Sequence, residues 1–347
     1  MRVFVPKDHA LHAPEWYLAD GSVRPCPEVP ARLDAILDAL AGKGHPIEQV
    51  SAAGTDAELL AAIRGVHTPG YLHYLETIHP IWAAEFAPGG GRDVLPDTFV
   101  RRMPGTSPPK KPSAQAGYYC FDMAAPIMAG TWPAALASAQ CAITAARFIA
   151  RARGAYALCR PPGHHAGPDY CGGFCYLNNA AIAAQLLLDR GHSRIAILDV
   201  DYHHGNGTQE IFYRRRDVLF ASLHAEPDTQ YPYYWGFAPE TGEGEGAGFN
   251  LNLPLKRGCG TADWFAALDA AFTRIADFDP QVLVVSLGVD TFEKDGVGDF
   301  TLSLDDFARL GVKLASTHTP VLIVQEGGYN LQAVGPCIAA VLGAFNA

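Results

Sequence analysis

Carboxylate and imidazole side chains gather where one apolar segment of the chain ends. Residues 195–198 are Ile, Ala, Ile and Leu, and Asp199, Asp201 and His203 follow closely. A run without polar alternation is typical of a strand covered on both faces, and ionisable groups beyond its carboxyl end lie where open α/β sheets place their sites. Because alternate side chains of an extended segment point the same way, Asp201 and His203 can converge on one metal ion.

Three further predicted strand ends carry polar groups. Pro-Pro-Gly precedes the tandem histidines 164–165, Gly-Val leads from a Val-rich run to Asp290, and Glu-Gly-Gly precedes Tyr329. In a parallel sheet all these ends share one edge. A lone Asp or His there is more often a cap or a packed side chain. Two tandem His pairs, at 164–165 and 203–204, are harder to explain as caps or packed side chains, because buried charges need a partner or a metal.

These residue types predict metal-assisted amide hydrolysis. Asp201, His203 and Asp290 supply three ligands and leave a position open, as in catalytic rather than structural zinc sites. The metal would polarise a carbonyl and acidify a bound water. The histidines 164–165 offer a general base and a partner that tunes it, and the Tyr329 hydroxyl can donate to an oxyanion.

The elements that must position these residues alternate between strand and helix patterns. This alternation predicts a single-domain α/β fold of three layers, α/β/α, with a mostly parallel central sheet. Residues 86–113 are rich in Pro and Gly, contain the basic pairs 101–102 and 110–111, and are too long for an ordinary connection, which indicates a functional or interface loop. Strands are predicted at 2–5, 155–159, 194–199, 217–223, 281–287 and 320–325, and helices at 30–40, 56–64, 69–78, 132–151, 178–189, 261–277, 305–316 and 333–345.

Composition limits the function classes. Hydrophobic residues make up 49% of the 347 residues, enough for a large core, and the formal net charge of −10 argues against nonspecific nucleic-acid binding. We expect no signal peptide and no membrane span, because no apolar run approaches ~18 residues. Eight scattered cysteines without a CxxC pair favour a reducing cytoplasm, and Cys171 and Cys175 lack the second pair of a four-thiolate zinc site.

Five ordered motifs then resemble a known family. The motifs RPPGHHAG, LDVDYHHGNGTQEIFY, ASLH, VSLGVDTFEKD and QEGGY are similar to the histone deacetylase superfamily, of arginase-like fold. The resemblance runs from Met1 to the C-terminus and is strongest to the bacterial acetylpolyamine amidohydrolases. It implies a zinc-dependent deacetylase that removes acetyl groups from acetylated polyamines.

The resemblance assigns roles residue by residue. It implies one zinc ion on Asp201, His203 and Asp290, His165 as general base and acid, and Tyr329 as the residue that polarises the carbonyl. It further implies electrostatic assistance from His164, a contact of Asn206 with His165, and tunnel walls formed by Gly173, Phe174 and Tyr231. Finally, it implies a structural potassium or sodium ion, bound by the side chains of Asp199 and Ser222 and by backbone carbonyls of Asp201, His203 and Leu223.

The chain departs from its relatives at the rim of the expected tunnel. Ser113 and Ala124 stand where polyamine-type members tend to have acidic residues, and Asp122 could substitute. Val297 stands at the position of the glutamate gatekeeper of the animal polyamine deacetylase. The segment at about 80–115 resembles an insertion through which the polyamine enzymes form homodimers and narrow the entrance.

Three alternatives stay open on sequence grounds. A protein acetyl-lysine deacetylase would share every catalytic residue and differ only at the rim. An arginase-like binuclear manganese hydrolase would need further carboxylates, but Gly205 and Gly288 occupy the positions where they would be useful. A non-catalytic binding protein on this fold would not need a complete set of catalytic positions.

Overall fold

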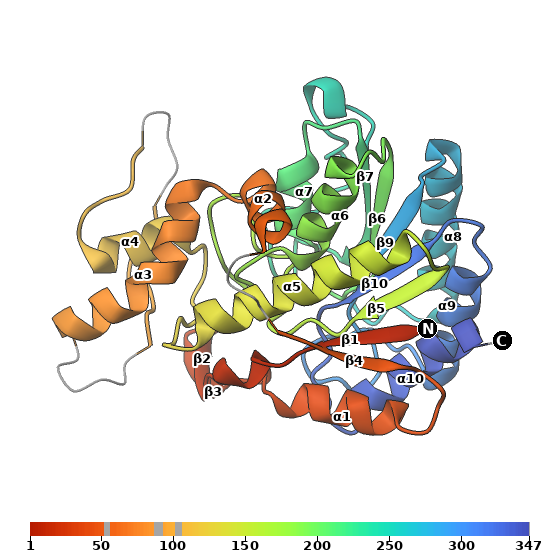
Figure 1. Ribbon diagram of the computed structural model, residues 1–347, viewed down its shortest axis with the longest axis horizontal. Coiled ribbons are helices and arrows are strands. Elements are labelled where there is room, and N and C mark those ends of the chain that lie inside the picture. The colour runs from red at the N-terminus through yellow and green to blue at the C-terminus, as the bar shows by residue number, and fades with distance from the viewer. Residues whose placement is uncertain (52–55, 87–92, 101–105, 347) are drawn as a thin grey trace.

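A parallel sheet of eight strands forms the centre of the molecule (Figure 1). The computed structural model describes residues 1–51, 56–86, 93–100 and 106–346. The strand order is β4-β1-β5-β10-β9-β6-β7-β8, and every pairing in this sheet is parallel. The strands are β1 (Arg2–Pro6), β4 (Ile47–Val50), β5 (Gly154–Ala157), β6 (Ile195–Asp199), β7 (Val218–Ala225), β8 (Asn250–Leu255), β9 (Val282–Leu287) and β10 (Val321–Gln325).

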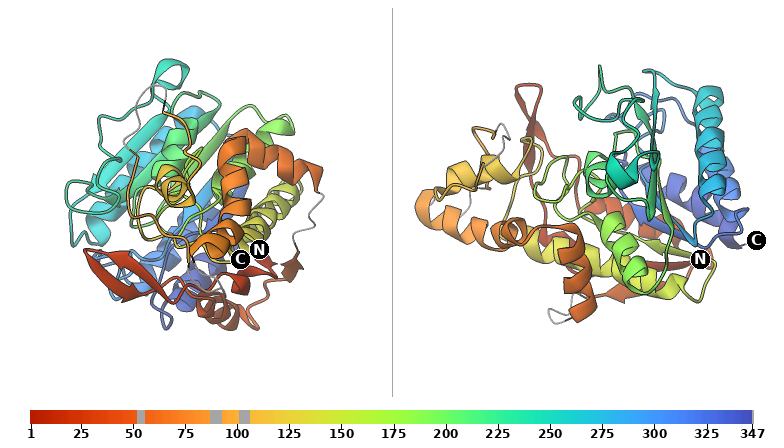
Figure 2. Two further views of the ribbon diagram at one scale, coloured as in Figure 1. Left: turned by 90° about the vertical axis from the view of Figure 1, so that its left-hand side faces the viewer. Right: turned by 90° about the horizontal axis from the view of Figure 1, so that it is seen from above.

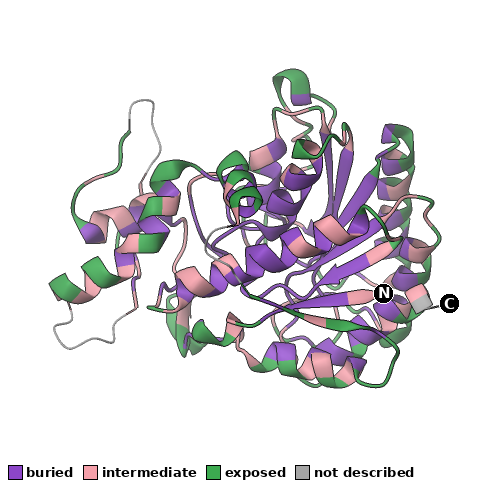
Figure 3. Ribbon diagram, viewed as in Figure 1, coloured by how far each residue is buried: buried purple, intermediate pink, exposed green. Residues whose placement is uncertain are grey.

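Helices cover both faces of the sheet, so the molecule has the three predicted layers. Along β6, Ile195 and Ile197 pack into the core on one face, whereas Ala196 and Leu198 pack into the core on the other. This explains the apolar run without alternation, since both faces are buried (Figure 3). One face is covered by α2 (Ala57–Val66), α5 (Thr131–Ile149) and α6 (Asn179–Asp189), and the other by α1 (Ala31–Leu40), α8 (Thr261–Phe278), α9 (Leu304–Ala315) and α10 (Val334–Gly343).

The region expected to be an insertion loop has helical ends. Helix α3 (Pro69–Phe86) runs eight residues beyond the predicted helix end at 78, and α4 (Pro112–Tyr119) starts before 115. Both helices lie beside each other, away from the sheet, at the left of Figure 1. Arg101 and Arg102 lie outside the described residues. The dimerisation role of the 80–115 region stays a prediction.

Several elements were not predicted. The antiparallel hairpin of β2 (Trp16–Ala19) and β3 (Ser22–Pro25) extends away from the central sheet (Figure 2). The strands β4 and β8 extend the sheet at its two edges. Helix α7 (Asn206–Phe212) is a further element absent from the predicted helices.

The described helices contain no segment that is both long and apolar enough to span a membrane. All eight cysteines are buried, unpaired thiols, which agrees with the absence of a disulfide framework.

Candidate active site

The carboxyl ends of adjacent strands bring the predicted site residues together. Strands β10, β9 and β6 are neighbours, and β6 ends at Asp199. Strand β5 lies on the other side of β10 and is followed by the loop that carries His164 and His165. Four segments far apart in the sequence therefore meet at one edge of the sheet.

Asp201, His203 and Asp290 form a compact group of possible metal ligands. One ligand atom from each lies within 4.8 Å of the others. The Nδ1 atom of His203 lies 3.2 Å from Asp201 Oδ1 and 3.1 Å from Asp290 Oδ2. The remaining carboxylate oxygens accept backbone N–H groups, from Gly327 to Asp201 at 2.9 Å and from Tyr202 to Asp290 at 2.9 Å. These contacts orient one oxygen of each carboxylate toward the same point as the His203 nitrogen.

The charges of this group fit a bound cation. Burial and the nearby charge of Asp201 raise the pKa of Asp290 to about 7. Burial opposes ionisation of Asp201 too, but the charges of His164 and His203 outweigh it and lower its pKa. Two buried carboxylates with an imidazole nitrogen between them are the donor set that zinc binds in proteins.

His165 presents one specific nitrogen to the cavity. Its Nδ1 lies 2.7 Å from Asn206 Oδ1. Tyr170 donates its hydroxyl hydrogen to Glu210 at 2.6 Å, so its oxygen can accept from Asn206 Nδ2 at 3.3 Å. The Asn206 oxygen must then face His165, which makes Nδ1–H the donor and leaves Nε2 with a lone pair. Burial and the neighbouring His164 lower the pKa of His165, so the ring is neutral and can take a proton.

His164 has the opposite electrostatic character. Its Nδ1 lies 3.0 Å from Asp199 Oδ2. Burial disfavours the imidazolium, but the attraction of Asp199 and Asp201 outweighs it and raises the pKa of His164 to about 10. The rings of His164 and His165 lie 4.0 Å apart between centroids. One histidine of the tandem is therefore held cationic next to a neutral one.

Asp199 and Ser222 face each other across β6 and β7. They are direct partners in the register of these strands, and both are fully buried. Ser222 Oγ lies 2.8 Å from His224 Nδ1, and Asp199 Oδ1 accepts the Asp201 N–H at 3.1 Å. The two side chains that the resemblance assigns to a monovalent cation are thus adjacent behind the Asp201 turn.

Glu326 is a buried carboxylate for which sequence reasoning assigned no role. Its Oε2 accepts the backbone N–H groups of Gly163 at 2.7 Å and His164 at 3.1 Å, which fixes the histidine loop to the end of β10. Burial raises the pKa of Glu326 to about 7, although the charge of His164 opposes this shift. The signal was a glutamate directly after a fully apolar strand, within the motif QEGGY.

Tyr329 is held by residues from two distant segments. Asp295 accepts its backbone N–H at 2.6 Å, and the Arg32 guanidinium lies 4.8 Å from the centroid of its ring. Arg32 also donates to the carbonyls of Gly328 at 2.7 Å and Glu326 at 2.6 Å, and is paired with Glu28 at 2.8 Å. Burial raises the pKa of Tyr329 well above its usual value, so the hydroxyl keeps its proton. Sequence reasoning missed Arg32, which lies in a predicted helix without any local motif.

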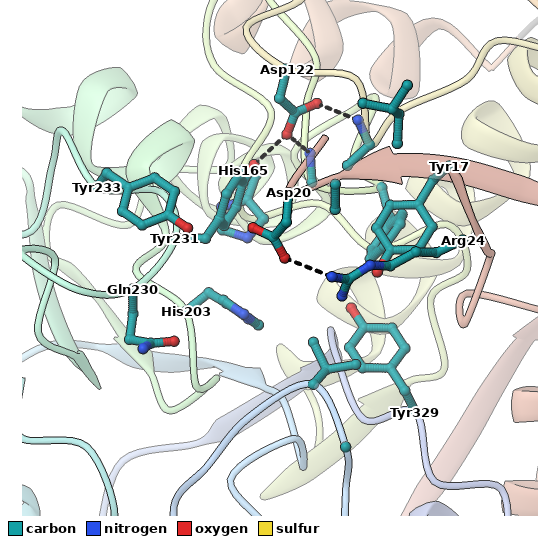
Figure 4. A pocket seen from close by; sticks show the side chains of 17 residues that line it. Tyr17, Asp20, Arg24, Asp122, His165, His203, Gln230, Tyr231, Tyr233 and Tyr329 are labelled. Atoms are coloured by element: carbon teal, nitrogen blue, oxygen red, sulfur yellow. Dashed lines mark hydrogen bonds and ion pairs between the residues drawn. The ribbon is translucent and has the colours of Figure 1, made fainter. Parts of the chain in front are cut away.

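These groups open into a cavity of about 330 Å³ (Figure 4). His165, His203 and Tyr329 line it, together with the predicted tunnel residues Gly173, Phe174 and Tyr231. The ring centroids of Phe174 and Tyr329 are 5.8 Å apart, and those of Tyr231 and His165 are 5.0 Å apart. The walls near the reactive groups are therefore mostly aromatic.

Asp122, which was expected to replace the missing acidic residues of the rim, is already hydrogen-bonded within the cavity wall. Asp122, Ala124 and Val297 line the cavity, whereas Ser113 is in α4 and is not part of the described lining. The Asp122 carboxylate accepts hydrogen bonds from the Tyr231 hydroxyl at 2.6 Å and from the N–H groups of Gly173 at 2.8 Å and Ala124 at 2.9 Å. These bonds hold the tunnel walls together and leave Asp122 poorly suited to replace the absent rim carboxylates.

The unpredicted β2–β3 hairpin supplies part of the cavity wall. Tyr17, Asp20 and Arg24 line it, and the ring of Tyr17 lies 5.3 Å from that of Phe174. A sequence signal existed, because the dipeptide Asp20-Gly21 is typical of a two-residue hairpin turn.

Comparisons with known proteins agree with this geometry. The family model of the histone deacetylase domain matches residues 26–345. Acetylpolyamine amidohydrolase 1 of Pseudomonas aeruginosa is 48% identical over 331 residues, covering 94% of each chain, and the acetylpolyamine amidohydrolase of Mycoplana ramosa is 44% identical over 343 residues, covering 99% of this chain and 98% of its own. The crystal structure of an acetylpolyamine aminohydrolase from Burkholderia pseudomallei is 41% identical, with a TM-score of 0.93 over 100% of this chain and 99% of that one.

The chain belongs to the histone deacetylase family. The predicted fold class and the resemblance drawn from the five motifs are confirmed. Membership implies an enzyme with a metal cofactor, and the Asp201, His203 and Asp290 group is a candidate for binding it.

Proposed function

We propose that this protein is a zinc-dependent amidohydrolase that removes acetyl groups from acetylated polyamines. The observation that carries the proposal is the convergence of three ligand groups within 4.8 Å beside a cavity lined by His165 and Tyr329. The relatives named as acetylpolyamine amidohydrolases support the substrate class, since they match this chain over 94% of its length or more.

The chain's own residues suit each proton movement of amide hydrolysis. Asp201, His203 and Asp290 would hold a zinc ion, and the ion would supply polarisation of the carbonyl and acidification of a water. His165 takes the proton of the attacking water at Nε2 and returns it to the leaving nitrogen. Tyr329 donates a hydrogen bond to the developing oxyanion, while Gly173, Phe174 and Tyr231 enclose the slim chain of the substrate.

A single zinc ion per chain is the metal content we propose. Glycines pack closely where a second metal would need further carboxylates. A Cβ atom at Gly205 would lie 2.2 Å from Asp199 Oδ2, and one at Gly288 would lie 2.0 Å from Asp201 Oδ2. These contacts argue against the binuclear alternative. We further propose a potassium or sodium ion on Asp199 and Ser222, with backbone carbonyls of Asp201, His203 and Leu223.

We also propose a homodimer formed through the 80–115 region, in the cytoplasm. The exposed side chain of Ile81, which is 44% accessible on the projecting helix α3, supports a protein contact there. Eight free, buried thiols support a reducing compartment.

The function is tested by measuring the turnover of N-acetylputrescine and the metal content of the same protein sample. We expect one zinc per chain and stoichiometric release of acetate, with much weaker cleavage of acetyl-lysine peptides. Preferential cleavage of the peptide would support the protein deacetylase instead.

The Tyr329→Phe variant tests the proposed chemistry. It should lower kcat by about 10²–10³-fold, because it removes one hydrogen bond to the oxyanion. Its zinc content and thermal unfolding should match those of the wild type. A Tyr329→Phe enzyme with wild-type kcat would refute the mechanism.

A further inference from the structure

An ion pair on the β2–β3 hairpin forms part of the cavity wall. The turn residues Asp20 and Gly21 have φ values of 50° and 69°, as a two-residue hairpin turn of type I′ requires. The register places Tyr17 opposite Arg24, on the same face of the hairpin. Leu18 donates its N–H to the Met123 carbonyl at 3.2 Å, which attaches the hairpin to the segment beside Asp122. The fold therefore fixes where Asp20 and Arg24 lie.

The pair is accessible and makes little contribution to stability. Arg24 Nη2 donates to Asp20 Oδ2 at 2.9 Å, and the two side chains are 48% and 67% exposed. Exposed ion pairs stabilise proteins weakly, so this pair can open at little cost. A guanidinium carries five N–H donors, and the bond to Asp20 uses one of them. Both partners line the same cavity as His165 and Tyr329, as Figure 4 shows.

Besides Asp20, the described cavity lining contains one further carboxylate, that of Asp122, which is already engaged in hydrogen bonds. Asp122 accepts three hydrogen bonds that hold Tyr231, Gly173 and Ala124. Asp20 and Arg24 are thus the charged side chains of this lining that can exchange their mutual contact for contacts with a ligand.

We propose that the Asp20–Arg24 pair recognises a zwitterionic head group, so that the protein also hydrolyses free amino acids acylated on their side-chain amine. The α-ammonium of such a substrate pairs with Asp20 and its α-carboxylate with Arg24, each replacing one half of the existing ion pair. This inference rests on the proposed function, because the same catalytic group cleaves the amide. Water adds to the acyl carbon, the C–N bond breaks, the nitrogen gains the proton, and acetate and the free amino acid are released.

Charge matching favours a zwitterion over a simple diamine. A diamine offers only cationic groups, so pairing with Asp20 would leave Arg24 without its partner beside a second positive charge. An acetyl-lysine inside a peptide has neither an α-ammonium nor an α-carboxylate, because both are amides. A free amino acid satisfies both members of the pair and leaves no buried or repelling charge.

Two nearly identical substrates test the proposal. N-acetylcadaverine and Nε-acetyl-L-lysine differ only in the α-carboxylate. We expect kcat/KM of the wild-type holoenzyme for Nε-acetyl-L-lysine to equal or exceed that for N-acetylcadaverine. Arg24→Gln should lower kcat/KM for Nε-acetyl-L-lysine by about tenfold or more, mainly through KM, because a charge-assisted hydrogen bond is lost. The same variant should raise kcat/KM for N-acetylcadaverine, because it removes the positive charge beside the cationic end of a diamine.

Arg214→Gln is the matched control. Arg214 forms a similar exposed pair with Glu243, at 2.8 Å, and neither residue lines the cavity. It should change neither substrate. The proposal is overturned if wild-type kcat/KM for Nε-acetyl-L-lysine is below about one tenth of that for N-acetylcadaverine, or if Arg24→Gln lowers both equally. Absence of turnover with both substrates would instead overturn the proposed function.

Discussion

Asn206 determines which nitrogen of His165 is free to take a proton. The chain of contacts from Glu210 through Tyr170 to Asn206 directs the amide oxygen at His165 Nδ1. A neutral amide in this position fixes the tautomer without adding negative charge. The basicity of His165 is therefore set by burial and by the cationic neighbour His164, both of which lower its pKa.

Replacing this amide by a carboxylate should make His165 more basic. In Asn206→Asp the new charge lies within hydrogen-bond distance of His165 Nδ1 and favours the imidazolium, which raises its pKa. Because the general base must be unprotonated, the acidic limb of the kcat/KM profile should move to higher pH. The profile of the variant against the wild type measures this, and coincident acidic limbs with equal zinc content would contradict it.

At the scale of elements, the loop from Gly172 to Cys175 brings its backbone into contact with the base. Gly173 has a φ of +52°, and a Cβ atom there would lie 2.3 Å from His165 Cδ2 and 2.8 Å from the Tyr231 hydroxyl. Phe174, with a φ of +66°, then directs its ring against Tyr17 and Tyr329. The loop can form this wall only if residue 173 has no side chain.

Gly173→Ala should displace the His165 ring and lower kcat/KM by about 100-fold, since a misplacement of about 1 Å can have this effect. Gly42→Ala is the control, because Gly42 also has a positive φ, of +72°, but no atom within 4 Å of an added Cβ. It should reduce stability by about 1–2 kcal/mol and leave kcat/KM unchanged. Equal losses of activity in the two variants would show that backbone strain, rather than the contact with His165, is responsible.

The sequence predicted the buried elements better than the half-exposed ones. Strand β6 was predicted to within one residue because both of its faces are buried and its apolar run is uninterrupted. Strand β8 was missed because it follows a Gly-rich segment, and only two of its six residues are buried. Helix α7 was missed because it is short and begins within Gly205-Asn206-Gly207. Local composition dominated the prediction at these places, whereas tertiary contacts determined the structure.

At the scale of the whole molecule, buried charge is concentrated at the carboxyl-end edge of the sheet, where the candidate active site lies. Asp199, Asp201, Asp290 and Glu326 are all 1% exposed or less. The strand-end motifs predicted Asp201 and Asp290 as ligands, and the family resemblance implied a ligand role for Asp199. The buried partners Arg32 and Glu28 instead come from α1 and the segment before it. No local pattern marks those two residues, since their role depends on long-range contact with residues 326–329.

Removing the metal should destabilise the whole protein. A ligand that binds only the folded state adds about 4 kcal/mol at roughly 1,000 times its Kd. For a chain of this size we expect the Tm to fall by roughly 5 °C after treatment with a chelator, and to recover with zinc. Differential scanning calorimetry measures both changes. Asp290→Asn should show little response to either treatment, and a zinc-dependent Tm in that variant would place the metal elsewhere.

The central position of β10 has a consequence for synthesis on the ribosome. This strand is the last of the sheet to be translated, yet it pairs with β5 on one side and β9 on the other. Until it emerges, the nascent chain has two unpaired strand edges in the middle of its core, and Arg32 lacks its carbonyl partners at residues 326 and 328. Chains that terminate before β10 therefore expose surfaces that favour aggregation and degradation, and they also lack Glu326 and Tyr329 of the candidate active site.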